Sequence, residues 1–368
     1  MGHAFLNGAE YSQGLSNFVM LIERRIGEII IPEGVDEIGN FAFCGCSLVR
    51  YIDIPDGLTS IGNQAFNGVG NANGADGKGP DGEVIIPDSV KVLSTNAFVW
   101  SGVRKFIVSK NIGIIKEHTF EGCGKCESYD FSRHENVPTL ENVNAFNYMP
   151  TYNKAKIYVP PKLYEEWKAD SNWTEYENFI FPKPSEGIEY TTEDSYGNNV
   201  DGYYVRGRGS FDGTHLVVPE KYNGAQGEMA VVGIDGTAFH GDKGLEFVYL
   251  PKSITYFGNY QLSDCTNLKR IYLPGFTDIG SFEFYNLYSL EYVKFGVSKV
   301  NIGGGVFAEC TGVVYDFSDS EGVAYLDSYG RGLEFGANPV IRVPAALYEE
   351  WKADTNWTNY ADYIVAAE

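Results

Sequence analysis

The sequence lacks long apolar runs and has few cations. Its apolar stretches are broken by Pro, Gly or charge within a few residues, and none approaches the roughly twenty apolar residues of a membrane-spanning helix. Only 28 Lys plus Arg stand against 49 Asp plus Glu, a formal net charge of −21. Such a surface repels a phosphate backbone. We therefore expect neither membrane insertion by this segment nor nucleic-acid binding.

Recognisable catalytic motifs are also missing. The five histidines fall in different parts of the chain, and no His-Glu-x-x-His or Gly-x-Ser-x-Gly pattern accompanies them. The acidic pairs Glu165-Glu166 and Glu349-Glu350 are neighbours in sequence, whereas glycosidase carboxylates face each other across a cleft. The sequence therefore predicts no catalytic residues, metal or cofactor, and a protein that is not an enzyme.

A signal peptide is not visible either, because no basic segment followed by an apolar core opens the chain. The opening residues Gly2–Gly8 look like the middle of a repeat that is seen again at Gly62–Gly68. We therefore expect the start to be an internal boundary, and the missing signal says little about export.

What the chain does contain is a short repeat. A pattern of the form I-x-I-P-x-x-V-x-x-I-G-x-x-A-F-x-x-C runs from Ile29 to Cys46 and begins again at Ile52, about twenty-three residues later. Pro and Phe are eleven residues apart in the best copies, which contain Pro32 and Phe43, Pro55 and Phe66, and Pro87 and Phe98. With 43% hydrophobic and 15% aromatic residues, the chain can bury the cores of such arrays.

The chain also contains a second, longer duplication. The segment Leu163–Asp170 returns as Leu347–Asp354, and Trp173 returns as Trp357, an offset of 184 residues. We therefore predict a first array with a helical cap over residues 1–182, a Pro- and Gly-containing linker over 183–187, and a second capped array over 188–368.

The local pattern predicts an α/β solenoid that is mostly β. Each I-x-I stretch before Pro reads as a short strand, and stacked copies form a parallel sheet on the concave face. The V-x-x-I-G stretch forms the opposite wall as short strands and turns or 3-10 pieces, and A-F-x-x-C turns Phe into the core. The Leu-Tyr-Glu-Glu-Trp-Lys segment, which follows Pro, reads as a short Trp-containing helix that closes each array.

These motifs resemble the BspA-like leucine-rich repeats of surface proteins from gut and oral bacteria and some protists. The resemblance covers most of the chain, and Tyr203–Ile234 is similar to the first repeat of arrays in that family. It implies a right-handed solenoid with a surface-exposed adhesive or interaction role. The family has no shared catalytic residues to assign.

The six cysteines invite a disulfide or metal hypothesis, which the repeat register opposes. Four of them follow the Phe or Leu of their repeat by three residues and are expected to be buried core residues: Cys46, Cys123, Cys265 and Cys310. Cys44 and Cys126 lie off this register. A disulfide between Cys123 and Cys126 is left as an alternative. Gly207–Gly213 reads as a turn and not a phosphate loop, and the Gly- and Asp-rich segment 70–82 as a surface loop and not a calcium site.

Candidate binding residues follow from strand alternation. If Leu268, Ile271 and Leu273 point inward, their neighbours occupy the open sheet face, where three tyrosines would form a strip. The candidates are Phe247, Tyr249, Arg270, Tyr272, Tyr292 and Lys294 in the second array, and Tyr51, Asp53, Lys105 and Tyr158, with Ile107 and Asp130, in the first. The alternative is that the aromatic residues simply cover the sheet.

Together these features predict a secreted or bacterial cell-surface protein that binds a host or bacterial protein, or a glycan, through the sheet face. Tyr and Arg are favoured at binding hot spots. One alternative is a carbohydrate-binding or substrate-docking module of a larger surface glycan-degrading system. Another is an enzyme with an unrecognised site between the arrays.

Overall fold

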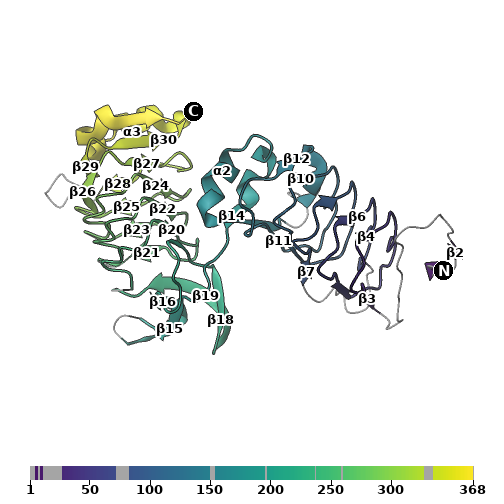
Figure 1. Ribbon diagram of the computed structural model, residues 1–368. Helices are drawn as coiled ribbons and strands as arrows, with labels where there is room; N and C mark the ends of the chain where they lie inside the picture. The colour runs from purple at the N-terminus through teal and green to yellow at the C-terminus, as the bar shows by residue number, and fades with distance from the viewer. Residues whose placement is uncertain are drawn as a thin grey trace. The chain divides into compact units, whose positions relative to one another are not determined.

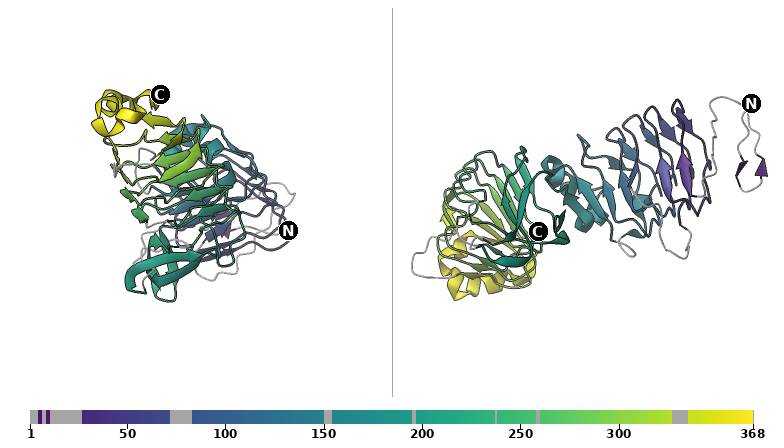
Figure 2. Two further views of the ribbon diagram at one scale, coloured as in Figure 1. Left: turned by 90° about the vertical axis from the view of Figure 1, so that its left-hand side faces the viewer. Right: turned by 90° about the horizontal axis from the view of Figure 1, so that it is seen from below.

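The computed structural model describes residues 5–6, 9–10, 27–71, 83–149, 154–194, 197–236, 238–257, 260–326 and 335–367. The chain folds into two compact units, residues 1–183 and residues 184–368. In both, short strands stack as successive rungs (Figures 1 and 2). Most of the expected surface loop 70–82, from residue 72 onward, lies outside the described residues. Near the N-terminus, β1 (Phe5–Leu6) pairs antiparallel with β2 (Ala9–Glu10).

Two parallel sheets form one face of the first unit. The first sheet consists of β3 (Glu28–Ile30) and β5 (Tyr51–Asp53). The second contains β7 (Glu83–Ile85), β9 (Lys105–Ile107), β11 (Ser128–Asp130), β13 (Lys156–Val159) and β14 (Ile180–Pro182) in this order. The opposite wall has β4 (Glu37–Ile38), β6 (Ser60–Ile61) and β8 (Val92–Leu93), then β10 (Ile114–Ile115) and β12 (Thr139–Leu140).

The core between these walls contains a column of phenylalanines, one from each repeat. Their ring centroids follow one another at 5.2, 4.9, 5.9 and 5.3 Å through Phe43, Phe66, Phe98, Phe120 and Phe146. Sharp turns bring each ring inward: Gln64 and Gly68, two residues on either side of Phe66, have φ of 53° and 68°. The expected inward Phe of the repeat is confirmed.

A Trp-containing cap ends the first unit. The 3-10 turn η1 (Val143–Phe146) lies in the last repeat; η2 (Pro161–Leu163), α2 (Tyr164–Ala169) and η3 (Thr174–Phe179) follow. Trp167 and Trp173 are fully buried with ring centroids 5.2 Å apart, and Trp173 Nε1 donates to Pro138 O at 2.8 Å. The cap thus covers the apolar end of the last repeat with aromatic side chains and forms a hydrogen bond to the array.

The second unit has a longer sheet face. Its seven parallel strands are β17 (His215–Val217), β20 (Phe247–Tyr249), β22 (Arg270–Leu273), β24 (Tyr292–Phe295), β27 (Val314–Asp316), β30 (Val340–Val343) and β31 (Ile364–Ala366). The opposite wall is β21 (Tyr256–Phe257), β23 (Asp278–Ile279), β25 (Asn301–Ile302) and β28 (Tyr325–Leu326). Beside it, β26 (Phe307–Thr311) pairs with β29 (Phe335–Ala337).

The two ends of the second unit differ. It begins with a four-stranded sheet in the order β15 (Glu189–Glu193), β16 (Asn199–Gly207), β19 (Gly227–Ile234), β18 (Lys221–Gly224). It ends with η4 (Ala345–Leu347), α3 (Tyr348–Ala353) and η5 (Thr355–Tyr363), where Trp351 and Trp357 repeat the buried pair of the first cap. The predicted leucine-rich-repeat solenoid with short helical caps is confirmed.

Candidate functional site

The sheet face of the first unit presents two rows of outward side chains. In β3, β5, β7, β9 and β11 the middle residue is buried and its two neighbours lie on the outer side. One row reads Glu28, Tyr51, Glu83, Lys105, Ser128 and Lys156, and the other reads Ile30, Asp53, Ile85, Ile107, Asp130, Tyr158 and Phe181. Tyr51, Ile30 and Ile85 are among the exposed large apolar side chains.

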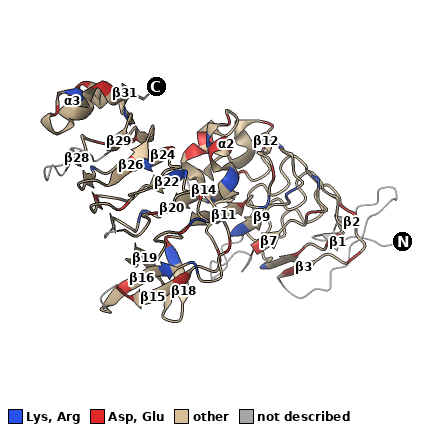
Figure 3. Cartoon of the chain, turned by 60° about the vertical axis from the view of Figure 1, so that its left-hand side comes forward, with Lys and Arg blue, Asp and Glu red and all other residues tan. Residues whose placement is uncertain are grey.

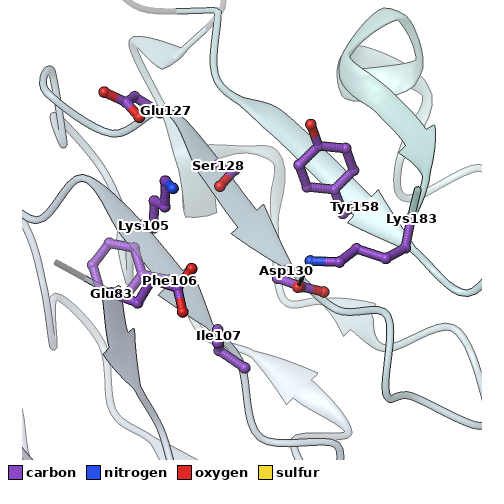
Figure 4. A pocket seen from close by; sticks show the side chains of 9 residues that line it. All are labelled: Glu83, Lys105, Phe106, Ile107, Glu127, Ser128, Asp130, Tyr158 and Lys183. Carbon is purple, nitrogen blue, oxygen red and sulfur yellow. Dashed lines mark hydrogen bonds and ion pairs between the residues drawn. The ribbon is translucent and has the colours of Figure 1, made fainter. Parts of the chain in front are cut away.

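An open hollow of about 220 Å³ lies in this face (Figure 4). It forms because β11 contributes the short side chains of Ser128 and Asp130 between longer ones on β9 and β13. Its lining brings together four predicted residues, Lys105, Ile107, Asp130 and Tyr158, with Glu83, Phe106, Glu127, Ser128 and Lys183. The predicted Tyr51 and Asp53 lie on β5, outside this lining.

The charges of the hollow fall into paired and unpaired groups. Asp130 is buried, accepts a hydrogen bond from Ser132 N at 2.8 Å and forms an ion pair with Lys183, whose ammonium lies 5.4 Å from the Tyr158 ring centroid. Glu127 pairs with Arg104. Among the described residues, Glu83 and Lys105 have no ion-pair partner. The hollow therefore offers one carboxylate and one ammonium to a ligand.

The sheet face of the second unit carries the predicted aromatic strip. Strand register places Tyr249 beside Tyr272 and Arg270 beside Tyr292, and the ring centroids of Tyr249 and Tyr272, and of Tyr272 and Tyr292, lie 5.8 and 5.9 Å apart. Phe247 extends the strip, 5.3 Å from Tyr272 and 5.5 Å from His215. The structure thus brings the expected rings together.

The expected openness of this strip needs correction at two residues. Phe247 is 4% exposed and Tyr272 is 6% exposed, while Tyr249, Arg270, Tyr292 and Lys294 are half-buried. Alternation correctly gives the direction of these side chains, but large rings on adjacent rungs cover one another. Much of the strip therefore covers its own sheet, and the first unit has the more open face.

A buried carboxylate, Asp316, organises the rest of the second face. It accepts hydrogen bonds from Tyr292 Oη at 2.7 Å and Ser318 N at 2.9 Å, and its oxygens lie 3.3 Å from Lys294 Nζ and 3.4 Å from Arg342 Nη1. Burial alone would raise the pKa of Asp316, but hydrogen bonds from Ser318 and the charge of Lys294 outweigh it and lower that pKa. Lys294 is thus held on the face as part of a fixed polar cluster.

Sequence reasoning missed the roles of Asp316, Arg342 and Lys183, although a signal was present. The tetrapeptide Tyr-Asp-Phe-Ser occurs once in each unit, at Tyr129–Ser132 and Tyr315–Ser318. In both copies the Asp lies on the outer face, is buried, and accepts from the backbone amide two residues later. A polar residue preserved between two copies of an otherwise apolar strand marks such a position.

The cysteines are free thiols in both units. Cys123, Cys265 and Cys310 are buried as expected, and each Sγ donates to the carbonyl oxygen of the core Phe one repeat earlier, at 3.2, 3.0 and 3.4 Å. Burial raises the pKa of Cys123 to about 12. Cys46, in the first repeat of the described array, is only half-buried.

The candidate phosphate loop and the acidic pairs of the sequence have structural roles. Arg208 pairs with Asp242 and donates to Gly213 O at 3.0 Å, so the Gly207–Gly213 segment is a clamped turn. The acidic pairs occupy the first turns of α2 and α3, coloured red in Figure 3. Within the described ranges, no group of three or more His, Cys, Asp or Glu side chains is arranged to hold a metal ion. No helix of the described part could span a bilayer.

A family model described as "BspA type Leucine rich repeat region" matches the chain in six copies, over residues 22–76, 82–189 and 230–329. These ranges cover well over half of the chain. The chain therefore belongs to this family of leucine-rich repeat proteins. Among curated proteins, none matches its sequence.

Solved structures of bacterial leucine-rich repeat proteins are similar to it. A leucine-rich repeat protein from Bacteroides ovatus is 17% identical, with 77% of this chain and 80% of that chain covered and a TM-score of 0.26. A leucine rich cell surface protein from Faecalibacterium prausnitzii is 17% identical, with 83% and 80% covered and a TM-score of 0.26. The pneumococcal vaccine antigen PcpA is 13% identical, with 93% and 79% covered and a TM-score of 0.28.

Proposed function

We propose that this chain is a non-catalytic interaction protein that binds a protein ligand through the sheet face of its first unit. The observation that carries the proposal is the exposure of Ile30, Tyr51 and Ile85 on the same face as the hollow. Protein interfaces combine an apolar, Tyr-rich centre with a polar rim. The second face, with its half-buried Tyr249, Arg270 and Tyr292, adds a smaller contact.

The size of the hollow supports a protein ligand over a cofactor or metabolite. Small-molecule sites usually enclose about 300–1,000 Å³, and the hollow at about 220 Å³ is smaller and open. It suits one side chain of a partner, with Glu83 and Lys105 available to a polar or charged group. The net charge of −21 favours partners with a basic rim.

We propose further that the protein is secreted or displayed on a bacterial surface. BspA-like repeats occur in bacterial surface proteins, which supports an extracellular ligand from a host or another bacterium. Protease treatment of intact producing cells should degrade the protein while a cytosolic marker survives. Protection of the protein until the cells are lysed would contradict this placement.

The binding face can be tested with matched variants. Ile85 on the sheet face and Ile114 on the opposite wall are both 52% exposed, so Ile85→Ala and Ile114→Ala remove the same exposed surface from different sides. Purified chain is tested by biolayer interferometry against a panel of purified host extracellular proteins and bacterial surface proteins. Tyr51→Ala plus Ile85→Ala should weaken binding at least tenfold, about 1.4 kcal/mol. Ile114→Ala should leave it within twofold.

Two results would overturn this assignment of the face. One is equal weakening by the sheet-face and opposite-wall variants. The other is the lack of any binding partner in the panel at micromolar concentrations. Circular dichroism and thermal unfolding of each variant would separate a lost contact from a lost fold.

A further inference from the structure

Trp100 differs from the other four tryptophans of the chain. Trp167, Trp173, Trp351 and Trp357 are fully buried in the caps, whereas Trp100 is 45% exposed. It lies in a turn two residues after the core Phe98, with φ of 57°. That left-handed backbone favours Gly and is unfavourable for a bulky residue. A large ring is therefore held in solvent at an unfavourable backbone position.

A second exposed ring stands beside Trp100. Tyr148 follows its own core Phe146 by two residues, has φ of 70° and is also exposed. The Trp100 and Tyr148 ring centroids are 5.6 Å apart, with 34° between the ring planes. Their repeats are not adjacent: the repeat between them has Gly122 at the same position. A Cβ on Gly122 would overlap the six-membered ring of Trp100. The ring can therefore occupy this position because residue 122 has no side chain.

The second unit repeats this arrangement at another turn position. Tyr260 and Phe282 each precede a core residue by two, with φ of 68° and 58°. Their rings are nearly parallel, at 5° and 6.3 Å between centroids, and Tyr260 is exposed. The Phe282 ring again lies against a glycine of the next repeat, because a Cβ on Gly305 would approach it within 2.7 Å.

Hydrogen-bonded polar side chains lie close to both ring pairs in the sequence. Four residues after Tyr260 and Phe282, Asp264 Oδ1 accepts from Asn286 Nδ2 at 2.8 Å, and Tyr288 Oη donates to Asn286 Oδ1 at 2.9 Å. Beside the first pair, Asn147 Oδ1 accepts from Tyr148 N at 3.0 Å, and His118 pairs with Glu121. Amides, hydroxyls and carboxylates match the hydroxyl groups of sugars. An acidic chain of net charge −21 disfavours anionic sugars.

The area of each pair distinguishes a glycan from a protein ligand. A stable protein interface buries about 800 Å² on each partner and 20–30 residues. Two rings supply a small fraction of that area, but each ring offers an apolar face of the size of one sugar ring. We propose that the Trp100–Tyr148 pair, with the Tyr260–Phe282 pair as its counterpart, is a stacking site for the pyranose rings of a neutral polysaccharide.

Native affinity electrophoresis tests this proposal on the full chain. Gels contain a soluble α-glucan, β-glucan, mannan or xylan, with alginate as the anionic comparison. At least one neutral polysaccharide should retard the wild-type chain, and Trp100→Ala plus Tyr148→Ala should weaken that retardation at least tenfold. Tyr51→Ala on the sheet face is the matched exposed-aromatic control and should leave the retardation by polysaccharide unchanged.

Trp100 fluorescence provides a second readout that does not depend on migration. Saturating polysaccharide should reduce acrylamide quenching of the wild type but not of Trp100→Phe, in which only buried tryptophans emit. Retardation by no neutral polysaccharide would overturn the proposal, as would retardation unaffected by the Trp100/Tyr148 and Tyr260/Phe282 double variants. Stronger retardation by alginate would contradict the neutral class. These outcomes are independent of protein binding at the sheet face, which Tyr51 and Ile85 report.

Discussion

The indole nitrogen of Trp173 donates a 2.8 Å hydrogen bond to the carbonyl oxygen of Pro138, thirty-five residues earlier in the chain. Trp357 forms the counterpart in the second unit, to Ala324 O at 2.7 Å. Each bond ties a cap to the array that it closes. The cap is thus part of the core and not an appended helix.

Trp173→Phe should therefore destabilise the first unit selectively. The buried carbonyl of Pro138 loses its donor, which costs about 1–3 kcal/mol, and the smaller ring leaves a cavity. Hydrogen exchange followed by mass spectrometry should show faster exchange in residues 83–183 and little change in the second unit. Trp357→Phe should produce the reverse pattern. Uniform acceleration over both units by either variant would contradict this view of the caps.

Glu283 should make the second unit less stable as pH rises. It occupies the small Ala position of the A-F motif, is fully buried, and accepts a hydrogen bond from Leu262 N at 3.1 Å. Burial raises the pKa of Glu283 from 4.5 to about 9. Between these values the folded chain keeps a proton that the unfolded chain has released. The free energy of unfolding therefore falls with rising pH, by up to about 1.4 kcal/mol per pH unit.

Glu283→Gln should remove this pH dependence and gain stability over the wild type above pH 7. Gln261 occupies the same position one repeat earlier, so the amide fits the repeat. Urea unfolding from pH 5 to pH 9 measures the difference between the two proteins. Parallel curves for wild type and variant would show that Glu283 is not the group responsible.

Asp316→Asn should destabilise the second unit at neutral pH by about 1.5–3 kcal/mol, because hydrogen bonds to a buried charge are lost. The pKa of Asp316 is lowered in the folded state, so the advantage of the wild type is full above the ordinary value of 3.8 and disappears as pH falls through the lowered value. Asp319→Asn is the control: it pairs with the same Lys294 at 3.1 Å but is exposed. That pair should contribute less than about 1 kcal/mol. Equal effects of the two substitutions would contradict a central role for Asp316.

Gly68→Ala and Gly122→Ala separate backbone strain from ring packing. Both glycines have φ of 68° at the same repeat position. A Cβ on Gly68 meets nothing within 4 Å. The stability that Gly68→Ala loses, about 1–2 kcal/mol, therefore measures only the cost of the left-handed backbone for a residue with a side chain. Gly122→Ala should cost about 1–3 kcal/mol more, because the Trp100 ring must move. Acrylamide quenching of Trp100 should change in the second variant only.

The sequence predicts features that depend on fixed spacing. The Phe column, the short strands and the Trp caps all follow from side chains that recur at one position of each repeat. Alternation also identifies which residues of β20 and β22 face outward. It does not reveal that Phe247 and Tyr272 are covered, because coverage depends on the size of rings on adjacent rungs.

The hollow and the aromatic pairs could not be read from the pattern for a related reason. The hollow depends on the short side chains of Ser128 and Asp130 lying between Lys105 and Tyr158, which requires the register of three strands at once. Trp100 and Tyr148 meet only because Gly122 lacks a side chain in the repeat between them. Their common signal is a bulky residue where other repeats have Gly.

The phenylalanine column has a consequence for how the first unit comes apart. Each ring contacts the ring before and after it, so stability passes only between neighbouring rungs. Removing an end ring such as Phe43 should fray one rung. Removing Phe98, which also contacts Phe106 of the sheet, should instead cut the column into two short blocks. The position of a lesion along the axis, more than its size, then sets how much of the array stays folded.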